Sequence, residues 1–429
     1  MACLSQTGQG ADGDAWPLFT RGWGGGFYTP VFLYFGALWT KLWGVSLASM
    51  RSIAGIFNVL TILGVYVLGR RVGGRRVALY ATVLACLSPW SFQFSRIAWD
   101  PPLAPAFLIW GAIAWLFRRP LIGAALAGIL FVGAMYSYPP FRFQAPMLFL
   151  ALFFLAGGHL LRDWKRLACF VATALPLSFP LYRFLSRGDS LNRTMELAIF
   201  SPGHLAANQG HLPKPLALLQ LFGDNVFAYL RPSFLFFRGD ANPRHSVQVM
   251  GQLGLLDDFA LLAGAALLFL ALRGKRTTTT EGSTPWSTKR LLALAAAGIF
   301  SGIATSALTW EGSPHALRSI GCWPFYSLLG GTVLTLAQAR WKWMGKAALG
   351  VGCAHAALYG WIYFQEYPRI AGEEFTGGIT REIRRWDTLT KDRQTQLARD
   401  YREQFRFLRI NDQGLSCVES ETLRRRYAD

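Results

Sequence analysis

The stretch Gly69-Arg-Arg-Val-Gly-Gly-Arg-Arg76 joins two long apolar runs, and its four arginines decide the fold. Further basic loops lie at Arg118–Arg119, Arg162–Arg166, Arg273–Arg290 and Arg340–Lys346. These loops fall on every second connection between apolar runs. In membrane proteins that cross the bilayer several times, lysine and arginine concentrate in the cytoplasmic loops. The pattern therefore predicts a polytopic membrane protein whose basic loops face the cytosol.

The composition agrees with this prediction. Of the 429 residues, 52% are hydrophobic and 16% are charged, whereas an average soluble chain has about 25% charged residues. The net charge of +19 would fit nucleic acid, but the positive residues sit in short loops beside apolar runs and suit anionic lipid head groups. We therefore expect membrane lipids and no nucleic acid as partners. The six cysteines form no CxxC pair and are interpreted as small apolar helix residues.

Ten apolar segments approach the roughly 20 residues that a membrane-spanning helix needs. We expect spans at Ser49–Gly69, Val77–Phe94, Leu103–Phe117, Leu121–Tyr138, Ala145–Leu161, Leu167–Leu185, Phe259–Leu272, Leu291–Leu308, Ile320–Ala339 and Ala347–Phe364. The aromatic stretch Pro30–Trp43 is interrupted by Lys41, so it is expected to lie at the membrane interface. The predicted fold is all-α, with about ten to eleven transmembrane or interfacial helices.

The predicted organisation has five parts. Residues 1–48 are the remnant of a first extracytoplasmic loop with the interfacial helix, 49–185 the transmembrane core, 186–258 a large extracytoplasmic loop, 259–364 the C-terminal transmembrane helices and 365–429 a small soluble extracytoplasmic tail. In the tail we expect a helix over Arg381–Asp400 and a strand over Phe405–Ile410. Because a short arm with no preceding apolar helix lacks a clear route across the bilayer, we expect that a first helix precedes the chain as given.

Two polar segments on the predicted outer side carry adjacent charges. Arg96 and Asp100 are four residues apart, so they share a face if the turn between them is helical. The carboxylate would then serve as a base or a metal ligand, and the arginine would hold a lipid phosphate; an ordinary surface ion pair is the alternative. His315 and Arg318 immediately precede an apolar run and suit an anionic head group, unless Arg318 merely snorkels to the interface.

Two more segments have weaker signals. The turn from Arg238 through Asp240 to Arg244 and His245 either binds a ligand or only shapes its loop. The aromatics before Arg142, among them Tyr138, form an interfacial girdle or stack on a sugar. His159 and His355 are expected to be packed or interfacial residues.

These segments resemble, in order, motifs of the GT-C glycosyltransferases, in the branch of bacterial relatives of protein O-mannosyltransferases and of the aminoarabinose lipid A transferase. The matching stretches are Phe27–Phe35, Lys41–Ser46, Val65–Arg76, Ser88–Asp100, Arg238–His245 and Pro314–Gly321. The resemblance implies a GT-C fold and a transferase of a bacterial plasma membrane. Such enzymes pass a sugar, with inversion, from a polyprenyl phosphate to a hydroxyl of a lipid, glycan or protein on the extracytoplasmic face.

The resemblance also implies roles for single residues. It assigns Asp100 to the acid of the second outer loop, which lines the active site, and makes it our catalytic candidate. Arg96, His315 and Arg318 become candidate ligands of the lipid phosphate or sugar, with Arg142, Arg238, Arg244 and Tyr138 as weaker ones. The acid that normally follows the first spanning helix is not found here, because Asp12 and Asp14 do not align with it. Some relatives bind a divalent metal, but no ligand set in this sequence demands one, so we expect no certain cofactor.

Two alternatives stay open. A truncated, non-catalytic relative would keep the fold without the base. A polytopic transporter of lipid-linked substrates would carry charged residues inside its spans and pseudo-symmetric halves, and neither is visible in the sequence.

Overall fold

A computed structural model describes residues 2–9, 14–21, 27–44, 46–187, 192–273, 286–372, 374–375, 388, 390–393 and 396. Within these ranges nearly all regular structure is helical. The exceptions are a short antiparallel ribbon of β1 (Thr20–Arg21) and β2 (Phe27–Tyr28), and two isolated bridges. The all-α class is therefore confirmed. The helix predicted over 381–400, apart from its described residues, and the strand predicted over 405–410 lie outside this description.

Seven helical segments are long and apolar enough to cross a membrane. They are α3 (Leu47–Val72), α7 (Pro120–Ser137), α9 (Trp164–Leu185), α13 (Leu255–Leu272), α14 (Thr288–Ala307), η5 with α15 (Ile320–Cys322, Trp323–Arg340), and α16 with η6 and α17 (Met344–Trp361, Ile362–Glu366, Tyr367–Ala371). An eighth span is a bent pair of α4 (Gly74–Leu87) and α5 (Pro89–Ser95). Two shorter apolar helices are α6 (Ala104–Trp115), which continues from η2 (Pro101–Leu103), and α8 (Phe141–Leu155).

Each of the ten predicted spans thus coincides with a helical segment, although among the described residues only seven meet the length criterion unaided. Proline accounts for the break in the predicted span Val77–Phe94. Pro89 has no backbone N–H to continue the α4 ladder, and Ser88 caps the next helix by accepting a hydrogen bond from Ser91 N at 3.3 Å. The axis bends there by 54°, which turns the chain toward Asp100.

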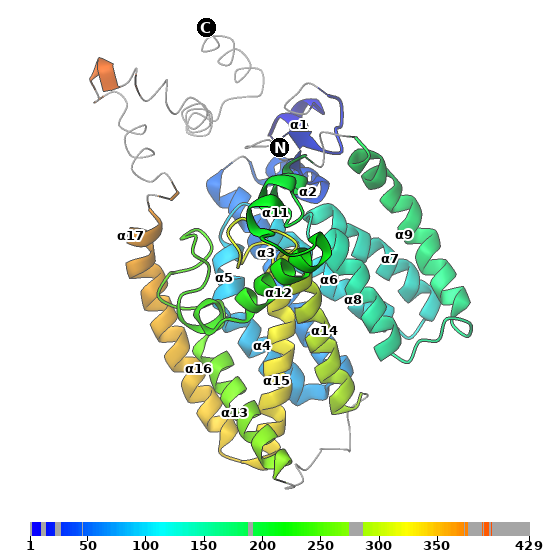
Figure 1. Ribbon diagram of the computed structural model, residues 1–429, viewed down its shortest axis with the longest axis vertical. Helices are drawn as coiled ribbons and strands as arrows, with labels where there is room; N and C mark the ends of the chain where they lie inside the picture. The colour runs from blue at the N-terminus through cyan, green and yellow to red at the C-terminus, as the bar shows by residue number, and fades with distance from the viewer. Residues whose placement is uncertain are drawn as a thin grey trace.

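The helices form a bundle around α15 (Figure 1). In the most apolar window of the span Ile320–Arg340, 83% of the residues are buried, against 6% in α9. The first therefore fills the core, where Trp323 and Phe325 are fully covered. α9 instead packs on α7 and exposes Leu175, Phe179 and other apolar side chains, as expected for a lipid-facing helix.

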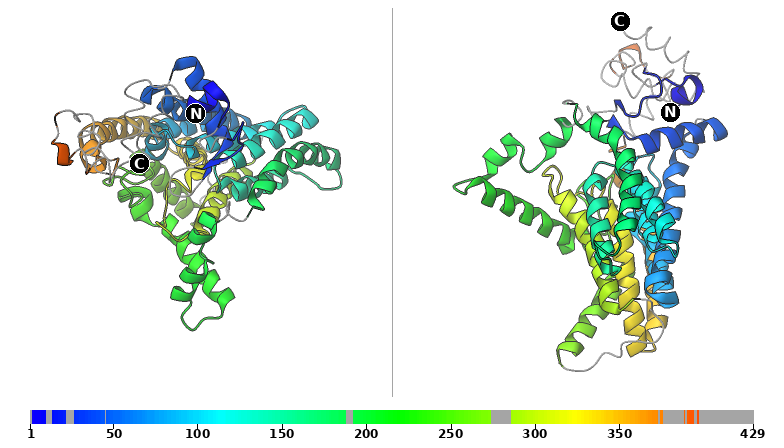
Figure 2. Two further views of the ribbon diagram at one scale, coloured as in Figure 1. Left: turned by 90° about the horizontal axis from the view of Figure 1, so that it is seen from above. Right: turned by 90° about the vertical axis from the view of Figure 1, so that its right-hand side faces the viewer.

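Shorter helices gather at one end of the bundle (Figures 1 and 2). They are α1 (Ala2–Thr7), α2 (Pro30–Trp43), α10 (Asn192–Leu197), α11 (Pro202–Asn208), α12 (Lys214–Leu230) and the π-helical turn η4 (Ser233–Phe237). The connection between α15 and α16, which carries Arg340 and Lys342, lies at the opposite end. The segment predicted as a large outer loop therefore contains three helices and a π-turn within its described residues.

Close packing of α15 on α4 gives a first testable prediction. A Cβ atom at Gly331 would lie 2.6 Å from the backbone nitrogen of Ala81, so Gly331→Val is expected to destabilise the protein by about 1–3 kcal/mol. The melting temperature in detergent should fall. Gly350→Val is the matched control, because nothing lies within 4 Å of a Cβ there. Equal melting temperatures for both variants would contradict this account of the core.

Candidate functional site

Asp100 lies between the bent pair α4–α5 and the start of η2. α5 ends at Ser95, so residues 96–100 are not helical and Arg96 does not share a face with Asp100. The side chain of Asp100 instead meets Thr29, which precedes α2. Thr29 Oγ1 lies 3.0 Å from Asp100 Oδ2 and 3.0 Å from the carbonyl oxygen of Ser137. One hydroxyl thus joins the carboxylate to the end of α7.

Burial sets the protonation behaviour of Asp100. It raises the pKa of this carboxyl to about 6, although the hydrogen bond from Thr29 and the positive charge of Arg142 lower it. A carboxyl group with a pKa near neutrality can take up and release a proton under physiological conditions. Asp100 is therefore suited to general acid or base chemistry.

Arg142 and Tyr138 both interact electrostatically with this carboxylate. Arg142 belongs to the first turn of α8, and its Nε is buried without a hydrogen-bond partner among the described residues. Tyr138 follows the last residue of α7. Burial raises the pKa of its phenol, Arg318 lowers it and Asp100 raises it. Tyr138 therefore lies within the electrostatic reach of both Asp100 and Arg318.

Arg318 is buried and already engaged. Its Nη1 donates to Thr309 Oγ1 at 2.9 Å and to the carbonyl oxygen of Glu311 at 2.5 Å, and its Nη2 donates to Glu311 Oε2 at 3.2 Å. Its side chain is 10% exposed, against 46% for that of Glu311. Snorkelling of Arg318 to the interface is thus excluded. A phosphate that binds Arg318 would have to replace the accessible Glu311 carboxylate.

A second polar cluster, which the sequence analysis did not assemble, consists of Asp240, His245 and His315. Asp240 Oδ2 accepts hydrogen bonds from His245 Nδ1 at 2.8 Å and from Ala316 N at 2.7 Å. Burial raises the pKa of Asp240, but the hydrogen bond and charge of His245, the charge of His315 and the hydrogen bond from Asn242 N together hold this pKa below its usual value. The polar turn around Asp240 was visible in the sequence, but its contact with residues 315 and 316 was not.

His315 completes the cluster from the loop between α14 and η5. Its backbone N donates to Tyr229 Oη on α12 at 3.1 Å, and its ring centroid lies 4.6 Å from that of His245. Burial and the nearby Arg318 lower the pKa of His315 to about 3. The imidazole is therefore neutral at physiological pH.

Three arginines predicted as ligands point elsewhere. Arg96 lies 5.5–5.6 Å from the ring centroids of Phe92, Tyr363 and Phe364. Arg244 Nε donates to the carbonyl oxygen of Glu374 at 2.9 Å, and its Nη2 forms an ion pair with the Glu374 carboxylate at 3.4 Å. Arg238 is exposed at the end of η4. Among the contacts of the described residues, none joins these three arginines to Asp100.

The two isolated histidines behave as predicted for packed or interfacial residues. His355 Nε2 lies 2.8 Å from the carbonyl oxygen of Leu87, and its Nδ1 accepts from Leu255 N at 3.3 Å. Both ring nitrogens are therefore used to join α16 to α4 and α13. His159 is exposed in the α8–α9 connection.

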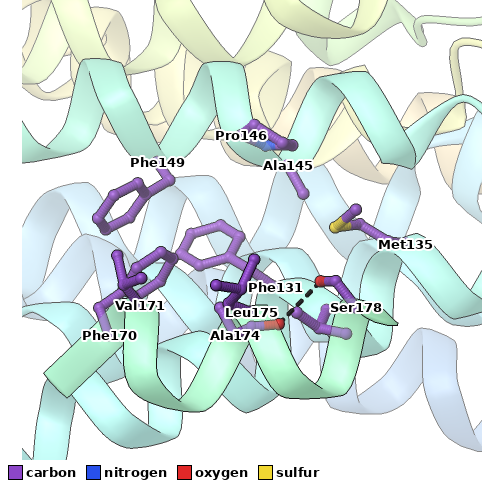
Figure 3. A pocket seen from close by; sticks show the side chains of 11 residues that line it. Phe131, Met135, Ala145, Pro146, Phe149, Phe170, Val171, Ala174, Leu175 and Ser178 are labelled. Carbon is purple, nitrogen blue, oxygen red and sulfur yellow. Dashed lines mark hydrogen bonds between the residues drawn. The ribbon is translucent and has the colours of Figure 1, made fainter. Parts of the chain in front are cut away.

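An apolar cavity of about 250 Å³ lies between α7, α8 and α9 (Figure 3). Met135 and Ala145 line it; Met135 lies one turn before Tyr138, and Ala145 lies about one turn after Arg142. The hydroxyl of Ser178, a polar lining group, donates to Ala174 O within α9 at 2.8 Å. The remaining lining residues are Phe131, Val132, Pro146, Phe149, Phe170, Val171, Ala174 and Leu175. The cavity therefore offers apolar surface about one helical turn away from Tyr138 and Arg142.

Residues 28–182 match the family model of dolichyl-phosphate-mannose-protein mannosyltransferases. This range contains Thr29, Asp100, Tyr138 and Arg142. No curated protein matches the chain at a significant level.

Solved structures give weaker likenesses. The oligosaccharyltransferase of Archaeoglobus fulgidus, in complex with zinc and sulfate, has 19% identity and a TM-score of 0.42 over 76% of this chain and 43% of its own. The same organism's AglB, with an inhibitory peptide and a dolichol-phosphate, has 16% identity and a TM-score of 0.41 over 88% and 51%. ArnT from Cupriavidus metallidurans, bound to undecaprenyl phosphate, has 14% identity and a TM-score of 0.33 over 72% and 67%.

The chain thus spans about half, or less, of the length of these oligosaccharyltransferases, and their activities are not transferred to it. The family match covers the segment that carries Asp100 and Arg142, and the resemblance read from the sequence is confirmed. Over residues 28–182 the chain is similar to the dolichyl-phosphate-mannose-protein mannosyltransferases, in agreement with the resemblance to GT-C glycosyltransferases noted in its sequence.

Proposed function

We propose that this protein transfers a sugar, with inversion, from a polyprenyl-phosphate donor to a hydroxyl group of a lipid, glycan or protein. The reaction would take place on the extracytoplasmic face of a bacterial plasma membrane. The observation that supports it best is the placement of Asp100, a partly buried carboxyl group, within the field of the unpaired Arg142 Nε. A base and a cation are the two groups that such a transfer requires.

The proposed step is a single displacement. Asp100 takes the proton from the acceptor hydroxyl while the hydroxyl oxygen forms a bond to the anomeric carbon of the donor. The bond between that carbon and the phosphate oxygen breaks, and the polyprenyl phosphate leaves with the electron pair. Arg142 lies where it would stabilise the negative charge that develops on this phosphate, and Arg318 would contribute after release from Glu311. Attack opposite the leaving group inverts the anomeric centre.

The apolar cavity between α7, α8 and α9 supports a lipid-linked donor. Its lining is mainly aliphatic and aromatic, and two of the three helices around it, α7 and α9, are long and apolar enough to cross a membrane. An isoprenoid chain in this cavity would gain about 25 cal/mol for each Å² of apolar surface removed from water. Its phosphate would then lie one helical turn away, near Arg142.

The hydrogen bond from Thr29 gives a prediction about pH dependence. Because this bond lowers the pKa of Asp100, Thr29→Val should raise it and shift the acid limb of the pH–rate profile upward from about 6. Transfer measured as a function of pH would show lower activity at pH 6 and near-normal activity at pH 8. An unchanged acid limb would show that the loss of activity at low pH does not arise from protonation of Asp100. Thr40→Val is the matched control, since Thr40 donates only within α2.

Transfer itself is tested with the full chain in liposomes, radiolabelled polyprenyl-phosphate sugars and a lipid extract as acceptor. The proposal expects labelled product and free polyprenyl phosphate in equal amounts. Donor that is bound but never cleaved would favour a non-catalytic relative, and intact donor moved across the bilayer would favour a transporter. Either result would contradict the proposed reaction.

The proposed step uses protein side chains alone. The residues that would hold a divalent metal form a different group, Asp240, His245 and His315.

A further inference from the structure

The cluster of Asp240, His245 and His315 combines two imidazoles and one carboxylate from two distant segments of the chain. Their potential ligand atoms all lie within 4.8 Å of one another. Asp240 and His245 are 3% and 4% exposed. Among the described residues, this is the one set of three histidine, cysteine or acidic side chains that meets this condition.

One ring nitrogen of the cluster is the observation that points to a bound cation. His315 Nδ1 is buried and has no hydrogen-bond partner among the described residues, although it lies 3.9 Å from Asp240 Oδ2. Leaving a buried polar nitrogen unpaired costs roughly 1–3 kcal/mol, and such atoms are rare in folded proteins. A cation between this nitrogen and the carboxylate would satisfy both.

The distances are close to those of a zinc site. Tetrahedral zinc, with Zn–N and Zn–O bonds of about 2.0–2.2 Å, places neighbouring ligand atoms about 3.3 Å apart. Asp240 Oδ2 lies 2.8 Å from His245 Nδ1 and 3.9 Å from His315 Nδ1, so the two separations bracket that value. Small side-chain rotations would equalise them, and zinc would replace the proton on His245 Nδ1, which passes to solvent.

The surroundings hold the three side chains in place. Asp240 Oδ1 accepts from Asn242 N at 2.8 Å and Oδ2 accepts from Ala316 N, so the carboxylate is oriented from both sides. The His245 ring lies 5.7 Å from the ring centroids of both Phe94 and Trp99. Outer contacts of this kind fix the ligands of metal sites. The charge of nearby Arg318, which would repel a cation, is compensated by Glu311.

We propose that Asp240, His245 and His315 bind a single Zn²⁺ ion. Two imidazoles with one carboxylate suit zinc, whereas magnesium and calcium prefer oxygen ligands. Three protein ligands leave the fourth coordination position for water or an anionic ligand. This inference does not depend on the proposed transfer reaction, because zinc binding is measured without donor or acceptor.

The test uses the full-length protein in detergent, stripped with a chelator and titrated with zinc against a chromophoric chelator. Metal content is then determined by mass spectrometry. Wild type and the control His211→Ala, an exposed histidine between α11 and α12, should bind one zinc per chain. His315→Ala and Asp240→Asn should bind at least about 100-fold more weakly, since even outer-shell changes cost roughly 10- to 100-fold. His315→Cys, which supplies another zinc ligand, should restore part of the affinity.

Two further measurements separate loss of a ligand from loss of folding. The zinc-free variants should melt at the temperature of zinc-free wild type, and cobalt-substituted wild type should show the visible absorption of a tetrahedral site. Zinc bound equally by His315→Ala and His211→Ala would overturn the proposal. So would wild-type protein with well under one zinc per chain, or cobalt-treated protein without the tetrahedral spectrum.

Discussion

Asp100→Asn is expected to lower the rate of glycosyl transfer by roughly 10²- to 10⁴-fold, the usual contribution of a positioned general base. The amide keeps the size and the contact with Thr29, but it cannot accept the proton of the acceptor hydroxyl. In the wild type, the rate should fall tenfold for each pH unit below about 6, because burial raises the pKa of Asp100 to that value. The residual rate of the variant should lose this acid limb. Initial rates from pH 4.5 to 8.5 provide the measurement.

The melting temperature provides the control that Asp100→Asn remains folded. A carboxyl whose pKa is raised by folding favours the folded state at low pH, and this contribution is lost as the pH rises from about 4 to about 6. Above pH 7 the native protein carries the cost of a buried charge that Asp100→Asn removes. The variant should therefore melt no lower than wild type at pH 8. Asp14→Asn, at an exposed position, should leave transfer unchanged, and full turnover by Asp100→Asn would exclude Asp100 as the base.

Arg142→Met is expected to reduce kcat by roughly 10²- to 10³-fold, since removing one preorganised group that stabilises transition-state charge typically costs this much. Methionine keeps an apolar stem of similar length but carries no charge for the departing phosphate. The same change should raise the pKa of Asp100, because Arg142 lowers it in the native protein. The acid limb of the pH profile should then shift upward together with the loss of kcat.

Two measurements distinguish this role from a structural one. Binding of polyprenyl phosphate alone should weaken in Arg142→Met, and the acid limb should shift only if the arginine acts on Asp100. Arg369→Gln is the matched control, because the Arg369 side chain is 78% exposed and forms an ion pair with Glu366. A variant that kept normal kcat with an unshifted acid limb would remove Arg142 from the site.

The spans were predictable because each depends on local composition. A run of apolar residues must be buried in lipid or protein, and basic loops mark its ends. The one interruption, at Ser88-Pro89, also has a local cause, although its consequence does not. The bend ends α5 at Ser95, which removes the helical spacing that would have paired Arg96 with Asp100. Sequence spacing of four predicts a contact only where the helix continues.

The candidate site was predictable only in part. Asp100, Tyr138, Arg142, His315 and Arg318 were named from the sequence, and in the structure electrostatic interactions link Asp100 with Arg142 and Tyr138, and Arg318 with Tyr138 and His315. Arg96 and Arg244 carry equal charge but face other partners, and Arg238 is exposed. Asp240 and His245 were noted in the sequence but not chosen as site residues, because the signal of their turn alone did not distinguish a ligand from a loop. Only contact with the segment around His315 makes that distinction.

By itself, the sequence determined the apolar spans, the ten helical segments and the family resemblance, because hydrophobic runs, charged loops and ordered motifs are properties of neighbouring residues. The tertiary structure decided which charges meet. Thr29 reaches Asp100 across 71 positions, and Asp240 meets Ala316 across 76. Such contacts depend on how whole helices pack, and helix packing is set by the summed fit of many side chains. These contacts therefore cannot be predicted from any short stretch of sequence.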